Sequence, residues 1–241
     1  MDKPKKGLKY LACENKITFL LLMMTAGMMG AYTFKMRGGI FCNAQTANVV
    51  MMGIAFGEKR WSDAFYFLIP ITAYFLGAVI SEFMPNPIKR LGFLRWDTYL
   101  CGFEMIILFI LGFVPLSMPD QIAQVTINFI ASMQYNTFRQ AEGMPMATTF
   151  CTNHIRQVGI SFVKVMKGKD HDGRLKRKGL MHICMLSVFL GGAIILTLSC
   201  SFLQERAIWL ALIPLAVLFI RLVYADLKEE HDYLDCKPSG H

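Results

Sequence analysis

The chain of 241 residues is too apolar for an ordinary soluble protein, with 54% hydrophobic residues, only 17% charged residues and a positive mean hydropathy. A net charge of +8 would suit nucleic acid in a soluble protein, but here the basic residues lie between apolar segments, where they set membrane orientation. The composition therefore excludes a soluble nucleic-acid-binding domain and predicts an all-α integral membrane protein with no nucleic-acid partner.

The predicted elements begin with an uncleaved span, because the basic start MDKPKKGLKYLACENK precedes an apolar run too long for a signal-peptide core. A membrane-spanning helix needs about 20 mostly apolar residues. Six segments of the chain meet this requirement: residues 17–34, 64–84, 98–116, 121–138, 180–202 and 207–225.

Two further segments, residues 41–56 and 148–163, are polar in their first halves and apolar in their second. Each is short for a full crossing. We therefore predict that both enter the membrane as re-entrant or half helices without crossing it. A full crossing by both is the alternative.

The distribution of basic residues favours the first reading. If neither short segment crosses, the basic N-terminus, the loop around residues 89–95 and the long basic loop at residues 164–178 all lie on one side. The opposite side then carries few basic residues: Lys35, Arg37, Lys59, Arg60 and Arg206. This predicts six transmembrane helices with both termini in the cytoplasm.

The two halves of the chain repeat the same order of elements: one span, one short segment that changes from polar to apolar, and two further spans. Matching anchors occur in the same order in residues 33–35 and 137–139, 53–56 and 159–162, and 75–78 and 189–192. Three spans per repeat is an odd number, so the second copy must enter from the opposite side, as in many transporters. We predict one transmembrane domain, residues 1–241, built from two inverted three-helix repeats at about residues 17–117 and 121–226.

A helix that begins inside the membrane leaves backbone N–H groups without partners, and lipid supplies none. Polar residues at both short segments can cap these groups: Gln45, Thr46, Asn48, Thr148, Thr149, Thr152 and Asn153. Two converging helix N-termini place partial positive charge at one point, which suits an anion or the negative end of a polar solute. The alternative is a pair of interfacial helices whose polar residues face the headgroups.

Polar residues inside the predicted spans add further candidates. Glu104 lies deep in the third span, either as a functional carboxylate or as a neutral acid bonded to a neighbouring helix. Arg156 either holds an anion or extends to the headgroups, and His154 matches Asn48 in the repeat and either contacts solute or is simply hydrogen-bonded in place. The predicted substrate-binding set is Gln45, Thr46, Asn48, Glu104, Gln134, Thr149, Thr152, His154 and Arg156.

Several longer motifs of the chain resemble those of a known family. They are Gly38-Gly39-Ile40-Phe41, Thr46-Ala47-Asn48, Met133-Gln134-Tyr135-Asn136-Thr137-Phe138-Arg139 and Thr148-Thr149-Phe150-Cys151-Thr152-Asn153. The chain resembles the bacterial YoaK-like multi-pass membrane proteins, a family of unknown function. Gly30 stands where the family usually has an aspartate, and Ala47 and Asn153 where it has glycines. The resemblance implies a six-span protein of the bacterial inner membrane and points toward transport.

The predicted function is a secondary transporter or channel-like permease for a small anionic or polar solute, with the site between the repeats. The alternative is a non-transporting scaffold or sensor whose basic loop, residues 164–178, attracts anionic lipid. An enzyme is not predicted, because the polar residues inside the membrane include no recognisable catalytic set. An enzyme would require a nucleophile and base within hydrogen-bond reach, such as Cys151 with His154. The seven scattered cysteines indicate no metal site and no cofactor. Membrane lipid and a second copy of the chain are the expected partners besides the solute.

Overall fold

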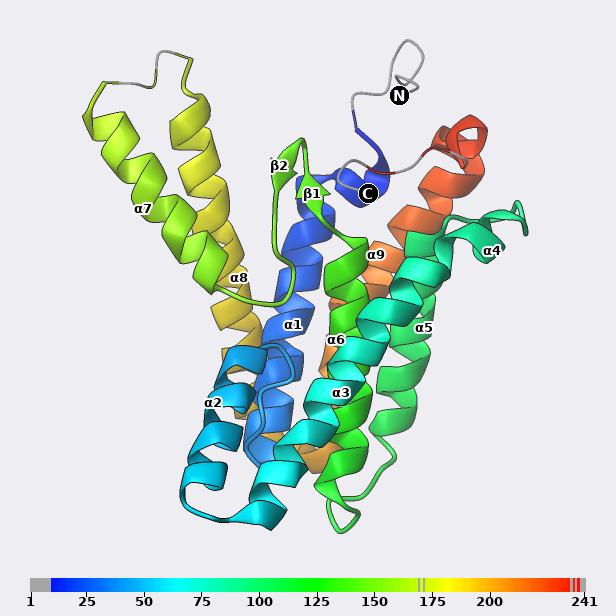
Figure 1. The fold of residues 1–241 in the computed structure, drawn as a ribbon. Coiled ribbons are helices and arrows are strands. Elements are labelled where there is room, and N and C mark those ends of the chain that lie inside the picture. Colours follow the sequence, from blue (N-terminus) through cyan, green and yellow to red (C-terminus); the bar gives the residue numbers. More distant parts are fainter. Residues whose placement is uncertain (1–9, 169, 171, 235, 237, 239–241) are drawn as a thin grey trace.

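The structure is a computed structural model that describes residues 10–168, 170, 172–234, 236 and 238. Most of these residues are helical, and the helices form one bundle (Figure 1). The α-helices are α1 (Lys16–Met36), α2 (Gln45–Gly57), α3 (Trp61–Phe83), α4 (Pro85–Lys89), α5 (Trp96–Leu111), α6 (Asp120–Thr137), α7 (Thr152–Met166), α8 (Arg174–Leu203) and α9 (Leu212–Tyr224).

Short elements complete the bundle at its ends. They are the 3-10 turns η1 (Ala12–Glu14), η2 (Gln204–Ala211) and η4 (His231–Tyr233), the π-helical turn η3 (Ala225–Glu229), and the strands β1 (Gln140–Ala141) and β2 (Met144–Pro145). The strands pair antiparallel as a small hairpin after α6. Each strand is only two residues long, so the hairpin is a minor addition to the helical fold that the sequence predicts.

Each of the six predicted spans is helical over most of its length, the last as η2 followed by α9. Three helical stretches within the described residues are long and apolar enough to cross a membrane: Lys16–Met36, Trp61–Lys89 and Arg174–Glu229. Large apolar side chains on the outside of the bundle, such as Phe75, Phe202 and Ile220, are exposed rather than packed in the core. An apolar exterior of this kind suits lipid rather than water.

Close helix contacts hold the bundle together in two places. In the first, α1 packs on α8, and a side chain at Gly27 or Gly192 would overlap the backbone of the other helix. In the second, α3 packs on α6, where a side chain at Gly77 would overlap the Phe129 carbonyl. Small residues allow this approach because lipid offers helices no hydrophobic drive to associate. Gly191, next to Gly192, faces open space.

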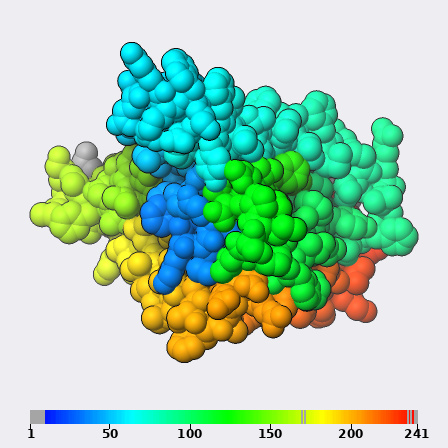
Figure 2. All heavy atoms as spheres, turned by 90° about the horizontal axis from the view of Figure 1, so that it is seen from below, coloured from blue at the N-terminus to red at the C-terminus, as the bar shows by residue number. Residues whose placement is uncertain are grey.

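The remaining helices are arranged around these two pairs. The short helices α2 and α7 pack on α3 and α8 respectively, and α5 packs on α9. Helix α1 contacts α8, helix α6 contacts α3, and α1 and α6 also touch each other. Seen from one end, the blue and green atoms of these segments lie between α2–α3 in cyan and α8–η2 in orange (Figure 2). The middle of the bundle is therefore formed by α1 and α6.

Both short helices begin at about half the height of the bundle and run outward in opposite directions (Figure 1). The depth of α2 follows from Asn43 just before it, whose side-chain amide donates to the Ala26 carbonyl in the middle of α1 (3.2 Å). At α7, the preceding Thr148 carbonyl accepts from the side chain of Gln134 in the last turn of α6 (3.3 Å). The polar starts of both segments thus lie inside the bundle.

The basic loop is shorter than the sequence suggested. Helix α7 continues to Met166 and α8 begins at Arg174, so much of residues 164–178 is helical. Lys169, His171 and the lysines of the first nine residues lie outside the described residues. The connections α3–α5 and α7–α8 lie at the same end of the bundle, as the positive-inside argument requires (Figure 1).

Candidate functional site

The start of α2 is closed by a chain of side-chain amides. Asn48, which is 2% exposed, donates to the Phe41 carbonyl (3.0 Å) and to the side-chain oxygen of Gln45 (3.2 Å). Gln45 in turn donates to the side-chain oxygen of Asn128 on α6 (2.6 Å) and to the Cys42 carbonyl (3.2 Å). These bonds fix the loop before α2 against the middle of the bundle.

The chain continues along α6 toward the end of α1. The Asn128 amide donates to the Gln124 carbonyl (2.7 Å), and the Gln124 amide donates to the Arg37 carbonyl (2.7 Å). The Tyr66 hydroxyl on α3 donates to the Gln124 side-chain oxygen (2.8 Å). The hydrogen bonds therefore tie α1, α2, α3 and α6 together through neutral groups.

The start of α7 is closed by two buried imidazoles instead. His154, in the first turn of α7, and His182, on α8, are both fully buried. Their Nδ1 atoms lie 2.8 Å apart, and His154 Nε2 lies 2.9 Å from the Ala147 carbonyl oxygen. His154 thus lies at the start of α7, as predicted, and contacts a second histidine, His182, that the sequence prediction did not include.

The same kind of hydrogen bond, from a first-turn side chain to a backbone carbonyl, occurs at both helix starts. Asn48 bonds the carbonyl of Phe41, seven residues earlier, and His154 bonds the carbonyl of Ala147, also seven residues earlier. In each half this bond folds the incoming loop back onto the first turn of the short helix. The repeat read from the sequence, which pairs Asn48 with His154, thus corresponds to the same local structure.

Tyr74 on α3 lies near polar groups of both starts. The Tyr74 side chain interacts electrostatically with Thr149 and Cys42, which precede α7 and α2 respectively. The buried atoms at the α7 start that have no hydrogen-bond partner among the described residues include Gln134 Oε1 and Thr148 Oγ1. Leaving a buried polar atom unpaired costs about 1–3 kcal/mol, so an occupant or water is expected there.

The capping prediction was wrong for both short helices. Their N-cap residues are Ala44 and Cys151, and neither helix has a side-chain cap. Thr46 and Thr152, which the sequence placed at the site, are exposed on the outside of their helices. The first-turn N–H groups of both helices are consequently not satisfied by their own cap residues.

Two charged candidates lie apart from this cluster. Arg156 is exposed and bonds only its neighbour Asn153 (3.0 Å) among the described residues, which matches the alternative that it extends to the headgroups. Glu104 on α5 is 1% exposed, and neither of its oxygens has a described hydrogen-bond partner. Such surroundings suit a neutral acid. His154 bonds His182 and Ala147. Cys151 and His154 therefore do not form a nucleophile–base pair.

The sequence prediction missed Gln124, Asn128, Tyr74 and His182. The first two had a readable signal, because Gln124, Asn128 and Ser132 recur every four residues and so form one polar stripe along an otherwise apolar span. Tyr74 and His182 had no such signal, since each is a single polar group whose role depends on tertiary contact.

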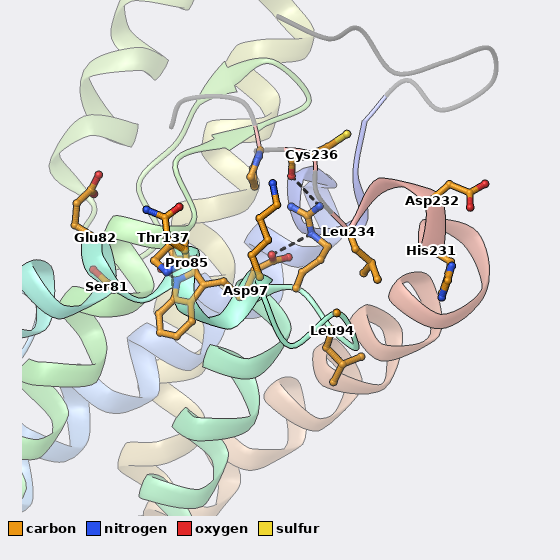
Figure 3. Close-up of a pocket in the computed structure, with 16 residues that line it drawn as sticks. Ser81, Glu82, Pro85, Leu94, Asp97, Thr137, His231, Asp232, Leu234 and Cys236 are labelled. Atoms are coloured by element: carbon orange, nitrogen blue, oxygen red, sulfur yellow. Dashed lines mark hydrogen bonds and ion pairs between the residues drawn. The ribbon is translucent and has the colours of Figure 1, made fainter.

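A separate cavity of about 370 Å³ lies at the end of the bundle where α5 begins (Figure 3). Its wall includes the buried ion pair Arg95–Asp97 (3.1 Å) and the C-terminal residues Leu234 and Cys236. Arg95 also donates to the Tyr233 and Cys236 carbonyls (3.2 and 3.1 Å). The sequence did not predict this cavity, and its contacts chiefly fasten the C-terminal segment to α5.

Glu230 makes a second fastening at this end. It is 2% exposed, and its Oε1 accepts from the Ala12 backbone N–H (2.6 Å). Burial raises the pKa of Glu230 to about 7, although the hydrogen bond from Ala12 acts in the opposite direction. This carboxyl therefore changes charge near neutral pH while it joins the two ends of the described chain.

Together, the apolar exterior, the helical bundle and the two short helices that begin inside it define a multi-pass transmembrane protein with buried polar groups in a mostly apolar core. Residues 18–221 match the model of the family described as protein of unknown function (DUF1275), and the chain belongs to this family.

The chain is also similar to the UPF0700 transmembrane protein YoaK of Bacillus subtilis (strain 168). The two are 21% identical over 211 residues, which cover 86% of this chain and 92% of YoaK. This similarity confirms the resemblance read from the sequence motifs. No solved structure matches the chain.

Proposed function

We propose that the protein is a secondary transporter or channel-like permease of the bacterial inner membrane for a small anionic or polar solute. The solute binds where α2 and α7 begin, among Gln45, Asn48, Gln134, Thr148 and Thr149. The observation that carries the proposal is the pair of unpartnered buried atoms, Gln134 Oε1 and Thr148 Oγ1, beside two short helices with no side-chain caps.

The architecture supports two inverted repeats. Exchanging α1 with α6, α2 with α7, α3 with α8 and α5 with α9 leaves the helix contacts unchanged. The pair α1–α8 becomes α6–α3, the pair α2–α3 becomes α7–α8, and α5–α9 becomes itself. Because α2 and α7 run in opposite directions, the exchange corresponds to a two-fold axis in the membrane plane (Figure 1).

The repeats imply six transmembrane helices, with α9 and the preceding η2 forming the last. In this arrangement α2 and α7 are half helices that enter from opposite faces. Both termini and the connections α3–α5 and α7–α8 are then cytoplasmic, because this end carries the larger share of basic residues. Basic residues in the first turns of α8, such as Arg177 and Lys178, would attract anionic lipid.

A solute at this place would receive backbone N–H groups from two helix starts and hydroxyl or amide groups from side chains. Such a site favours a negative group without requiring a buried cation. These groups are suited to hold a solute in position, so we propose binding and passage rather than a chemical reaction. A non-transporting scaffold would not need unpaired polar atoms at mid-depth of the bundle.

The test is a thermal-shift screen of the detergent-purified protein against chloride, phosphate, short carboxylates and uncharged polar metabolites. A ligand that binds only the folded state raises apparent stability, by about 2.7 kcal/mol at 100 times its Kd. Thr148→Val removes an unpartnered hydroxyl at nearly constant volume, so the variant should fold and lose the saturable shift.

The matched control is Thr152→Val, the same substitution at the first residue of α7, where the side chain is exposed. It should keep the shift of the unmodified protein. An equal shift in Thr148→Val would contradict a solute at this place, and no shift across the panel would favour the scaffold alternative.

A further inference from the structure

The two buried histidines at the start of α7 define one arrangement of protons when both are neutral. The Ala147 carbonyl can only accept, so His154 Nε2 must carry a hydrogen and donate to it. A neutral imidazole has a single N–H, and His154 Nδ1 is therefore an acceptor. His182 Nδ1, 2.8 Å away, must then be the donor.

This assignment leaves His182 Nε2 as a bare basic nitrogen. The atom is buried and has no hydrogen-bond partner among the described residues. Its lone pair lies in the ring plane and faces away from the bond to His154, because Nδ1 and Nε2 lie on different sides of the ring. A proton can bind there without breaking either existing hydrogen bond.

Binding a proton on His154 is different. Its Nε2 already carries hydrogen and its Nδ1 already accepts from His182, so protonation there would require the shared hydrogen to move. The geometry therefore distinguishes the two rings, although both are fully buried.

We infer that the His154–His182 pair is a proton-binding site in which His182 Nε2 takes up one proton from water and returns it to water. A single N–H bond forms and breaks, and His182 becomes an imidazolium that still donates from Nδ1 to His154. Where the protein transports a solute as proposed above, this proton is the coupling ion, and that role alone rests on the proposed function.

The charged groups near His182 determine whether another ion binds together with the proton. The described groups that act on it electrostatically are His154 on α7 and Lys178 one turn earlier on α8. From α1 and η2, which also pack on α8, no described titratable group acts on it. A second positive charge beside Lys178 is unfavourable alone, and an anion near Thr148 would offset it. Proton and anion binding should therefore strengthen each other by the same factor.

The first half of the chain provides a matched variant. Asn48 occupies the position equivalent to His154 and makes the same bond to the carbonyl seven residues earlier. His154→Asn should therefore keep the start of α7 folded, with its amide donating to Ala147 and its oxygen accepting from His182. The variant removes one titrating ring and leaves the proposed proton-binding atom in place.

The experiment is a pH titration of the full chain in detergent micelles with 15N-labelled histidine rings, and the proton is the only ligand. His182→Gln assigns the signals of His182, and His154→Asn those of His154. Near neutral pH we expect His154 to carry hydrogen on Nε2 and His182 on Nδ1. On acidification the His182 Nε2 signal should move from the unprotonated to the protonated position, in the unmodified protein and in His154→Asn.

Three results would overturn the inference: hydrogen on His182 Nε2 at neutral pH, protonation of His154 before His182, or no proton uptake by either ring before acid unfolding. Each is obtained without any solute. A failure here therefore leaves the proposed solute site standing, and a failed solute screen leaves the proton site standing.

Discussion

The starts of α2 and α7 share one hydrogen-bonding pattern and differ in chemistry. In both, a side chain in the first turn bonds the carbonyl seven residues earlier. At α2 that side chain is an amide within a chain of amides, whereas at α7 it is an imidazole bonded to another imidazole. The amide side is neutral at every physiological pH, and the imidazole side can take up a proton. One half can thus hold a polar solute while the other also responds to pH.

The largest expected effect concerns the glycines that make the two halves pack alike. Gly77→Ala and Gly192→Ala each place a methyl group against the backbone of the neighbouring helix, in equivalent helix pairs. Both should destabilise the protein by about 1–3 kcal/mol, seen as a lower melting temperature in detergent. Gly191→Ala is the control, because that position faces open space. Stability lost at only one of the two sites would break the equivalence of the halves.

The amide chain should be sensitive to loss of a single member. Gln45→Leu removes the donor to Asn128, whose side-chain oxygen then stays buried. We expect a loss of about 1–2 kcal/mol, within the usual range for an orphaned polar group, measured by thermal unfolding. His154→Asn should cost less, since an amide already fills the equivalent position in the first half. If His154→Asn proves the more damaging, the two starts are not interchangeable in design.

The pH response of Glu230, at the end of the bundle where α5 begins, must be distinguished from that of the histidines. Unfolded glutamate has a pKa of about 4.3, whereas burial raises the pKa of Glu230 to about 7. Its contribution to stability is therefore fully present below about pH 4.3 and is lost as pH rises through about 7. Between pH 5 and 8 we expect the unmodified protein to lose about 1–2 kcal/mol through this group, with allowance for solvent screening.

Glu230→Gln should remove that part of the pH dependence, and Glu229→Gln, on the exposed neighbouring residue, should not. The measurement is the melting temperature in detergent between pH 5 and 8. Equal pH dependence in both variants would show that Glu230 does not titrate in this range.

The helices were predictable because apolar length and the spacing of polar starts are properties of the sequence itself. Asn48 and His154 were found because the repeat aligned them, and both prove to be buried. Thr46 and Thr152 were misplaced because helical rotation turns them outward, and only the packing of α2 on α3 and α7 on α8 decides which face is buried. His182 could not be found from sequence, since its role is created by the α7–α8 contact.

The central claim is that the two halves enter the membrane from opposite faces. It is tested most directly by placing single additional cysteines at Lys59, after α2, and at Lys167, after α7, and labelling intact cells with a membrane-impermeant maleimide. The unmodified protein gives the background from its native cysteines. The account predicts labelling from outside at residue 59 and protection at residue 167. Labelling of both, or of residue 167 alone, would contradict it.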